Sequence, residues 1–158
     1  MNINDLLIKI ATIYPLGKSN VAPGTISSIF TCIVFYIISE YTNIIELVII
    51  FIFSLYISFI SVQRYIEKYG YKDHKCIVID EFAGQFLSLM VIPFSKMEMN
   101  FINIFIIFII FRFFDISKIG LRSVEKLPGV LGIILDDLVA GIFVIIIVIG
   151  FLEFFNVG

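Results

Sequence analysis

The chain has 158 residues, of which 60% are hydrophobic and 15% are charged, and its formal net charge is −2. This length indicates a single domain over residues 1–158. A mean hydropathy of +1.09 lies far outside the soluble globular range and indicates an integral membrane protein, which excludes soluble enzyme classes. We expect contact with the lipid bilayer and no nucleic-acid partner.

The first residues predict a short helix at the membrane surface that ends near Pro15. A signal peptide is not expected, because the apolar run is short and interrupted and no small-residue cleavage site follows. Five apolar stretches come next, at 22–39, 44–62, 77–93, 99–114 and 138–155. The second and fifth are long enough to span a bilayer, and the others approach the required length of about 20 residues. Between the last two stretches, the glycines and the proline of 116–135 predict a loop that closes over a site.

Basic residues predict how these stretches lie in the membrane. If the N-terminus is cytoplasmic and all five stretches cross, ten of the eleven Lys and Arg residues fall on the cytoplasmic side, and only Lys96 falls outside. This distribution follows the positive-inside rule. We therefore expect an all-α fold, a small polytopic membrane helical bundle of about five apolar helices with a cytoplasmic N-terminus.

The start of the first apolar stretch is rich in small and hydroxyl residues. Pro23 suits the first turn of a helix, and it is followed by Gly24, Thr25 and Ser28. The free N–H groups of such a helix start can bind a phosphate. The alternative is an ordinary helix start with capping residues.

Five carboxylates lie at the edges of the later apolar stretches: Asp80, Glu81, Asp115, Asp136 and Asp137. The predicted topology places all of them at the cytoplasmic face. Ionisable groups at membrane depth are costly and usually mark a functional site. Acids in a tight cluster stay ionised only if a cation joins them, and hard oxygen ligands favour Mg²⁺.

Small residues follow both acid pairs at helical spacing. Gly84 lies four residues after Asp80, and Gly141 lies four residues after Asp137. Each glycine would share a helical face with its acid, so two helices could pack closely and bring their carboxylates together. The alternative is that each pair sits at a helix start, where the helix dipole favours negative charge.

Arg112, Asp115 and Lys118 are spaced by three residues and would share a helical face. Two interpretations fit this spacing. The three side chains form an ion-pair ladder at the membrane boundary, or Asp115 serves a metal or a water molecule while the two bases hold a phosphate.

Four blocks of the chain resemble the phosphatidylglycerophosphatase A family. They are APGTISS at 22–28, DHKCIVIDEFAGQF at 73–86, FRFFDISK at 111–118 and GVLGIILDDLVAG at 129–141. Two departures stand out: the family usually has Pro-Trp-Pro where this chain has residues 119–121, and it has Gly where this chain has Ser27.

The resemblance implies a Mg²⁺-dependent phosphatase of phospholipid biosynthesis, which hydrolyses phosphatidylglycerophosphate to phosphatidylglycerol and inorganic phosphate. It implies a bacterial cytoplasmic membrane location with the active site facing the cytoplasm. The metal ligands would be Asp80, Glu81, Asp136 and Asp137. The catalytic residues would be Asp115, Asp136, Lys118 and Arg112, and the substrate phosphate would meet Gly24, Thr25 and Ser28.

Two other functions are alternatives. A small ion or proton transporter would use the acidic residues as a coupling site, and a catalytically silent membrane subunit would be stable without metal and show no turnover. Transport predicts polar groups near the middle of the bilayer. Here the acids gather at one edge, which favours chemistry on a lipid headgroup.

Overall fold

The computed structural model describes residues 2–70 and 75–156, and this part of the chain forms helices and turns without a strand. The helices are α1 (Ile3–Ala11), α2 (Pro23–Ser39), α3 (Ile44–Tyr69), α4 (Ile79–Leu89), α5 (Val91–Ser95), α6 (Phe101–Ser117), α7 (Arg122–Glu125) and α8 (Val130–Asn156). A 3₁₀ turn, η1 (Leu16–Lys18), connects α1 to α2. The predicted all-α fold is confirmed. Asp73 and His74, at the start of the second sequence block, and the basic residue Lys72 lie outside the described residues.

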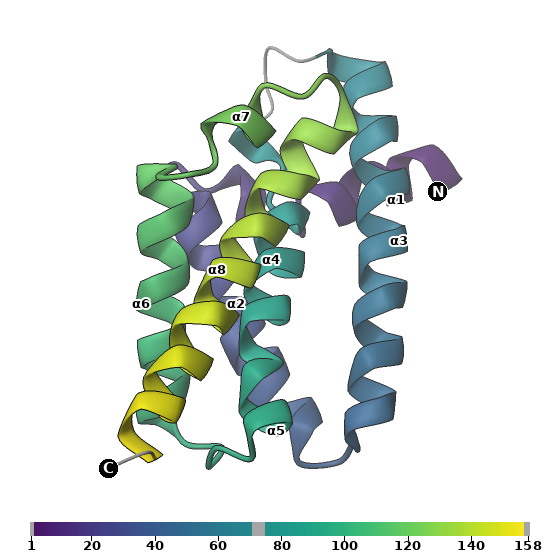
Figure 1. Ribbon diagram of the computed structural model, residues 1–158. Helices are drawn as coiled ribbons and strands as arrows, with labels where there is room; N and C mark the ends of the chain where they lie inside the picture. The colour runs from purple at the N-terminus through teal and green to yellow at the C-terminus, as the bar shows by residue number, and fades with distance from the viewer. Residues whose placement is uncertain (1, 71–74, 157–158) are drawn as a thin grey trace.

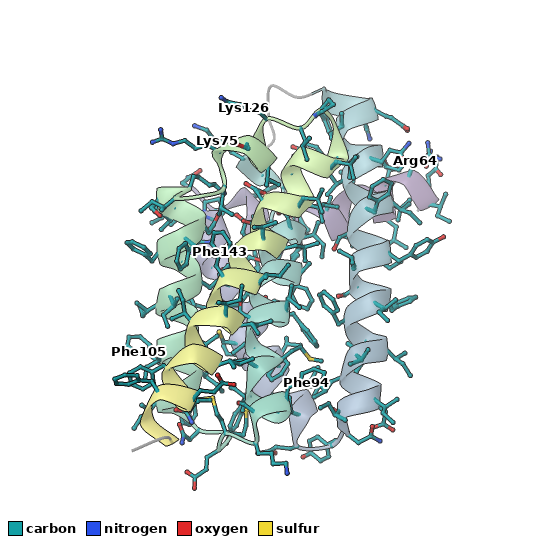
Figure 2. The ribbon with its side chains drawn as sticks, in the orientation of Figure 1. Arg64, Lys75, Phe94, Phe105, Lys126 and Phe143 are labelled. Carbon is teal, nitrogen blue, oxygen red and sulfur yellow. The ribbon has the colours of Figure 1, made fainter. Side chains whose placement is uncertain are left out.

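The long helices stand side by side, and α1 lies across the end of α3 that is close to α7 (Figure 1). An ion pair between Lys68 of α3 and Asp5 of α1, 3.0 Å apart, joins these two helices. The labelled basic side chains Arg64, Lys75 and Lys126 lie toward this α7 end (Figure 2). The bundle therefore has a basic end, as the sequence predicts.

Among the described residues, two helices are long and apolar enough to cross a membrane: α3, and α8 over Val130–Phe154. α2 is apolar but shorter. The stretch 77–93 is divided into α4 and α5, because Pro93 has no N–H to donate to the carbonyl of Leu89, where α4 ends. Five crossing helices and a cytoplasmic N-terminus stay predictions.

The last helix begins earlier than the sequence suggested. α8 starts at Val130, directly after Gly129, whose φ of +77° sets the end of the preceding turn. The expected loop over 116–135 is therefore shorter, and it also contains α7. Asp136 and Asp137 lie in the second turn of α8, so the alternative that they sit at a helix start is wrong. Asp80 and Glu81 do lie in the first turn of α4.

α4 lies in the middle of the bundle and packs against α2, α3, α6 and α8. The ring of Phe86 on α4 meets Phe35 of α2 edge-on, with centroids 5.0 Å apart, and stacks on Phe51 of α3 at 6.2 Å. All of these elements hold α4 in place, which fixes the two acids in its first turn.

α4 and α8 approach each other closely because glycine lies at their crossing. A Cβ at Gly84 would lie 2.5 Å from the backbone oxygen of Asp137, and a Cβ at Gly141 would lie 2.8 Å from the oxygen of Gly84. Small residues permit such backbone contact between membrane helices. The predicted close packing is confirmed, and it places one acid pair opposite the other.

Gly84→Ala should destabilise the protein by about 1–3 kcal/mol, the usual cost of forcing an extra group into a packed contact. The added methyl would meet backbone, which cannot rotate away. Gly150→Ala on α8 is the matched control, since nothing lies within 4 Å of a Cβ at that position. Thermal unfolding in detergent measures both. Equal unfolding temperatures for the two variants would contradict the crossing described above.

Candidate active site

The start of α4 is fixed by hydrogen bonds to the backbone of Val78. The N–H of Val78 donates to the carbonyl of Ala11 at 3.0 Å, and its carbonyl accepts from the hydroxyl of Ser27 at 2.7 Å. No side chain among the residues that the structure describes caps the helix at this end. The segment around α1 and the first turns of α2 therefore position Asp80 and Glu81.

Three carboxylates converge between α4 and α8. Oxygen atoms of Asp80, Glu81 and Asp137 all lie within 4.8 Å of one another. Each of the three has a buried oxygen without a hydrogen-bond partner among the described residues: Oδ1 of Asp80, Oε2 of Glu81 and Oδ1 of Asp137. Like charges this close repel strongly unless a cation lies between them. The three acids, called the acidic trio below, therefore fit a hard metal ion with oxygen ligands.

Asp136 lies beside the acidic trio and has partners of its own. Its Oδ2 accepts from the Lys118 ammonium at 2.7 Å, and its Oδ1 accepts from the backbone N–H of Asp137 at 2.9 Å. The structure thus brings Asp136 to the site as predicted, but next to a base instead of within the trio.

Asp115 lies between two bases at the end of α6. Arg112 pairs with its Oδ2, and the Lys118 ammonium lies 2.9 Å from its Oδ1. The predicted ion-pair ladder is present, yet it is not only local, because Lys118 also contacts Asp136 on α8. Lys118 ends α6 in the left-handed region, with φ +53°, which turns the chain at this residue.

The Lys118 ammonium stays protonated in this setting. Burial lowers the pKa of Lys118, but the negative charges of Asp137 and Asp115 and hydrogen bonds to Asp136 and Asp115 outweigh burial and raise it above its ordinary value. The site as a whole holds five carboxylates against three bases, Arg112, Lys118 and Lys75. This excess of two negative charges favours the binding of a cation.

The start of α2 borders the same site. Pro23 is the first residue of α2, as predicted, and a Cβ on Gly24 would collide with Oε1 of Glu81 and lie 3.4 Å from Nη1 of Arg112. The hydroxyl of Ser28 accepts from Nη1 of Arg112 at 3.4 Å. Gly24 and Ser28 thus meet the acids and bases of the site. Thr25 is half-buried and forms no hydrogen bond or ion pair with them among the described residues.

The acids and Lys118 described above line a cavity of about 390 Å³. The trio, Asp115, Asp136 and Lys118 all line it, together with residues of the turn before α8 and of its first turn. Gly129 and Gly132 are among them, so the glycine-rich segment does border the site. The cavity offers carboxylate oxygens as metal ligands and an ammonium group beside them, which suits a metal-assisted reaction on a phosphate group.

Comparison with known proteins agrees with this chemistry. The sequence model of the family Phosphatidylglycerophosphatase A matches residues 9–152. The chain belongs to this family. It is 31% identical to the Phosphatidylglycerophosphatase A of Haemophilus influenzae over 94% of this chain and 95% of the relative. It is 29% identical to that of Escherichia coli over 80% of this chain and 72% of the relative.

A further relative, from Bacteroides thetaiotaomicron, is provisionally named a phosphatidylinositol-3-phosphatase and is 28% identical over 90% of this chain and 91% of that protein. No solved structure matches the chain. The family and the names of these relatives identify the chain as a phosphatase enzyme with a phospholipid substrate.

Three features of the site were not predicted from the sequence. Lys75 lines the cavity, and the Ser27 hydroxyl holds Val78. Gln85 is fully buried, and neither atom of its amide has a hydrogen-bond partner among the described residues. Gln85 lies four residues after Glu81, a spacing that could have indicated it. Nothing in the sequence indicates the hydrogen bond from Ser27 to Val78, except that the family usually has glycine at position 27.

Proposed function

We propose that this phosphatase hydrolyses phosphatidylglycerophosphate to phosphatidylglycerol and inorganic phosphate, with Mg²⁺ held by Asp80, Glu81 and Asp137. The observation that supports this most is the acidic trio, with three buried, unpartnered carboxylate oxygens from two helices. Oxygen ligands at a phosphate site favour Mg²⁺ over softer metals. The names of the Haemophilus and Escherichia relatives support this substrate.

Bound Mg²⁺ would neutralise the phosphate monoester and stabilise the charge that develops on its oxygens during transfer. Lys118 would hold a phosphate oxygen through its ammonium, as a charged donor. The Nε of Arg112 is buried without a partner among the described residues, so it retains a donor for the phosphate. Backbone N–H groups near Gly24 and Thr25, with Ser28, would complete the cradle.

Asp136 is the better base of the two remaining acids. Asp115 is paired with both Arg112 and Lys118, which stabilises its charged form and leaves it to orient these two bases. Asp136 would accept a proton from the attacking water as the water oxygen bonds to phosphorus. The bond from phosphorus to the glycerol oxygen breaks, and that oxygen leaves with a proton from solvent.

We place α3 and α8 across the bacterial cytoplasmic membrane, with the site facing the cytoplasm. The gathering of basic residues at the site-bearing end supports this orientation. The acids lie near the ends of their helices at this one end, which favours headgroup chemistry over transport through the bilayer.

Phosphate release from phosphatidylglycerophosphate by the purified protein in detergent tests the proposal. Release should require Mg²⁺, fall to background with excess chelator and return when Mg²⁺ is added again. Phosphatidylinositol 3-phosphate is the comparison substrate, and we expect slower release from it. Folded protein that releases no phosphate with Mg²⁺ would overturn the activity, and faster release from the phosphoinositide would overturn the substrate.

A further inference from the structure

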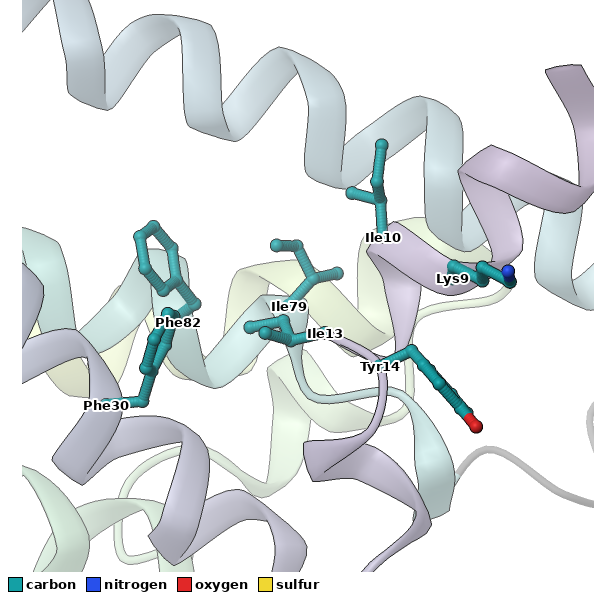
Figure 3. Close-up of a pocket in the computed structure, with 7 residues that line it drawn as sticks. All are labelled: Lys9, Ile10, Ile13, Tyr14, Phe30, Ile79 and Phe82. Carbon is teal, nitrogen blue, oxygen red and sulfur yellow. The ribbon is translucent and has the colours of Figure 1, made fainter.

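A second cavity, of about 350 Å³ and called the groove below, opens between α1, α2 and α4 (Figure 3). Its walls are apolar and consist of Ile10, Ile13, Phe30, Ile79 and Phe82. Lys9 and Tyr14 supply its polar groups. Phe30 and Phe82 lie together at one end, with ring centroids 6.4 Å apart, and Lys9 and Tyr14 lie at the other (Figure 3).

This groove is separate from the active site, and the two cavities share no lining residue. Ile79 and Phe82 are three residues apart on α4 and share a helical face. Asp80 and Glu81 lie between them in the sequence and face the other cavity. The hydrogen bond from Ser27 to Val78 joins α2 to the start of α4. A molecule in the groove would therefore be different from the molecule undergoing hydrolysis.

Two lysine side chains lie near the Tyr14 ring, at the polar end of the groove. The Nζ atoms of Lys9 and Lys18 lie 5.8 Å and 5.2 Å from the centroid of the Tyr14 ring. Basic pockets between membrane helices bind anionic lipid headgroups, and tyrosine is enriched at the headgroup level. The groove thus has an apolar end that suits an acyl chain and a cationic end that suits a phosphate.

We propose that one anionic glycerophospholipid occupies this groove as an accessory ligand, with its phosphate beside Lys9 and Lys18 and an acyl chain against Phe30 and Phe82. The inference rests on the membrane placement proposed above, and it goes beyond the phosphatase activity. The bound lipid would pack directly on the helix that carries Asp80 and Glu81. The lipid composition of the bilayer would therefore affect the acidic trio through contacts of the bound lipid with α4.

A single introduced tryptophan tests the proposal, because the chain has none. Phe30→Trp places the fluorophore in the groove, at a residue that is 38% exposed. The protein would be reconstituted in phosphatidylcholine vesicles with a minor fraction of lipid brominated on its acyl chains. That fraction is either phosphatidylglycerol or phosphatidylcholine. We expect stronger quenching by the anionic lipid, and each lysine should contribute about fivefold to this preference.

Phe113→Trp on α6 is the matched control, since Phe113 is also exposed and lies near the same end of the bundle. Both brominated lipids should quench it equally. The combined Lys9→Gln and Lys18→Gln change should remove the preference at position 30. Phe82→Trp reports on the same groove if the first variant fails to fold.

Equal quenching at position 30 by the two lipids, or a preference that survives the loss of both lysines, would overturn the accessory site. Absence of quenching at both positions would overturn the membrane placement instead. The measurement uses no substrate, so a failure of the proposed phosphatase activity would not change its result.

Discussion

Asp137→Asn should abolish Mg²⁺-dependent phosphate release while the protein remains folded. Asp137 is the member of the acidic trio that α8 supplies, and the amide removes a charge with little change in shape. Changes around metal ligands typically cost 10–100-fold, so loss of a direct ligand should cost at least about a hundredfold. Measuring phosphate release over a Mg²⁺ titration gives the fold loss of activity.

The unfolding temperature separates this effect from damage to the fold. Without metal, Asp137→Asn should unfold at the same or a higher temperature, because it relieves repulsion from Asp80 and Glu81. Glu153→Gln is the matched control, an exposed acid on the same helix, and it should behave as the parent. Full activity in the Asp137→Asn protein would remove Asp137 from the metal site.

Lys118→Met should lose both activity and stability. Lys118 lies within 4 Å of three carboxylates, and its side chain is only 25% exposed. Removing one member of a buried charge network leaves the others unpaired, at a cost of about 3 kcal/mol. Denaturant unfolding in detergent measures the loss of stability, and phosphate release measures the loss of turnover.

Two comparisons make this result specific to the position. Lys126→Met removes an exposed lysine at the same end of the bundle and should change neither quantity. Lys118→Arg keeps the charge and should recover most of the stability. A Lys118→Met protein as stable and as active as the parent would show that this lysine does not hold the acids together.

The sequence predicted the convergence of the acids because spacing within a helix is regular. Gly84 and Gly141 each follow an acid by one turn, and this pattern requires only two helices that touch. The ladder of Arg112, Asp115 and Lys118 was predictable for the same reason. Both predictions depend on local geometry that the sequence determines.

Contacts between distant segments could not be predicted in this way. Ser27 and Val78 are 51 residues apart, and their hydrogen bond exists only because α2 packs beside α4. The contact of Lys118 with Asp136 depends on the turn that ends α6 and on the early start of α8. The division of the stretch 77–93 into two helices was not predicted, although proline removes a helical hydrogen bond.

The hydrogen bond from Val78 to Ala11 makes helix α1 part of the structure that supports the active site. No side chain of α1 lines the active-site cavity, yet the last residue of α1 accepts the backbone N–H that precedes the acids of α4. A buried N–H without an acceptor costs about 1–3 kcal/mol. Residues 3–11 are therefore as much a part of the catalytic end as the loop before α8. A family member whose sequence starts later would need another acceptor at this position.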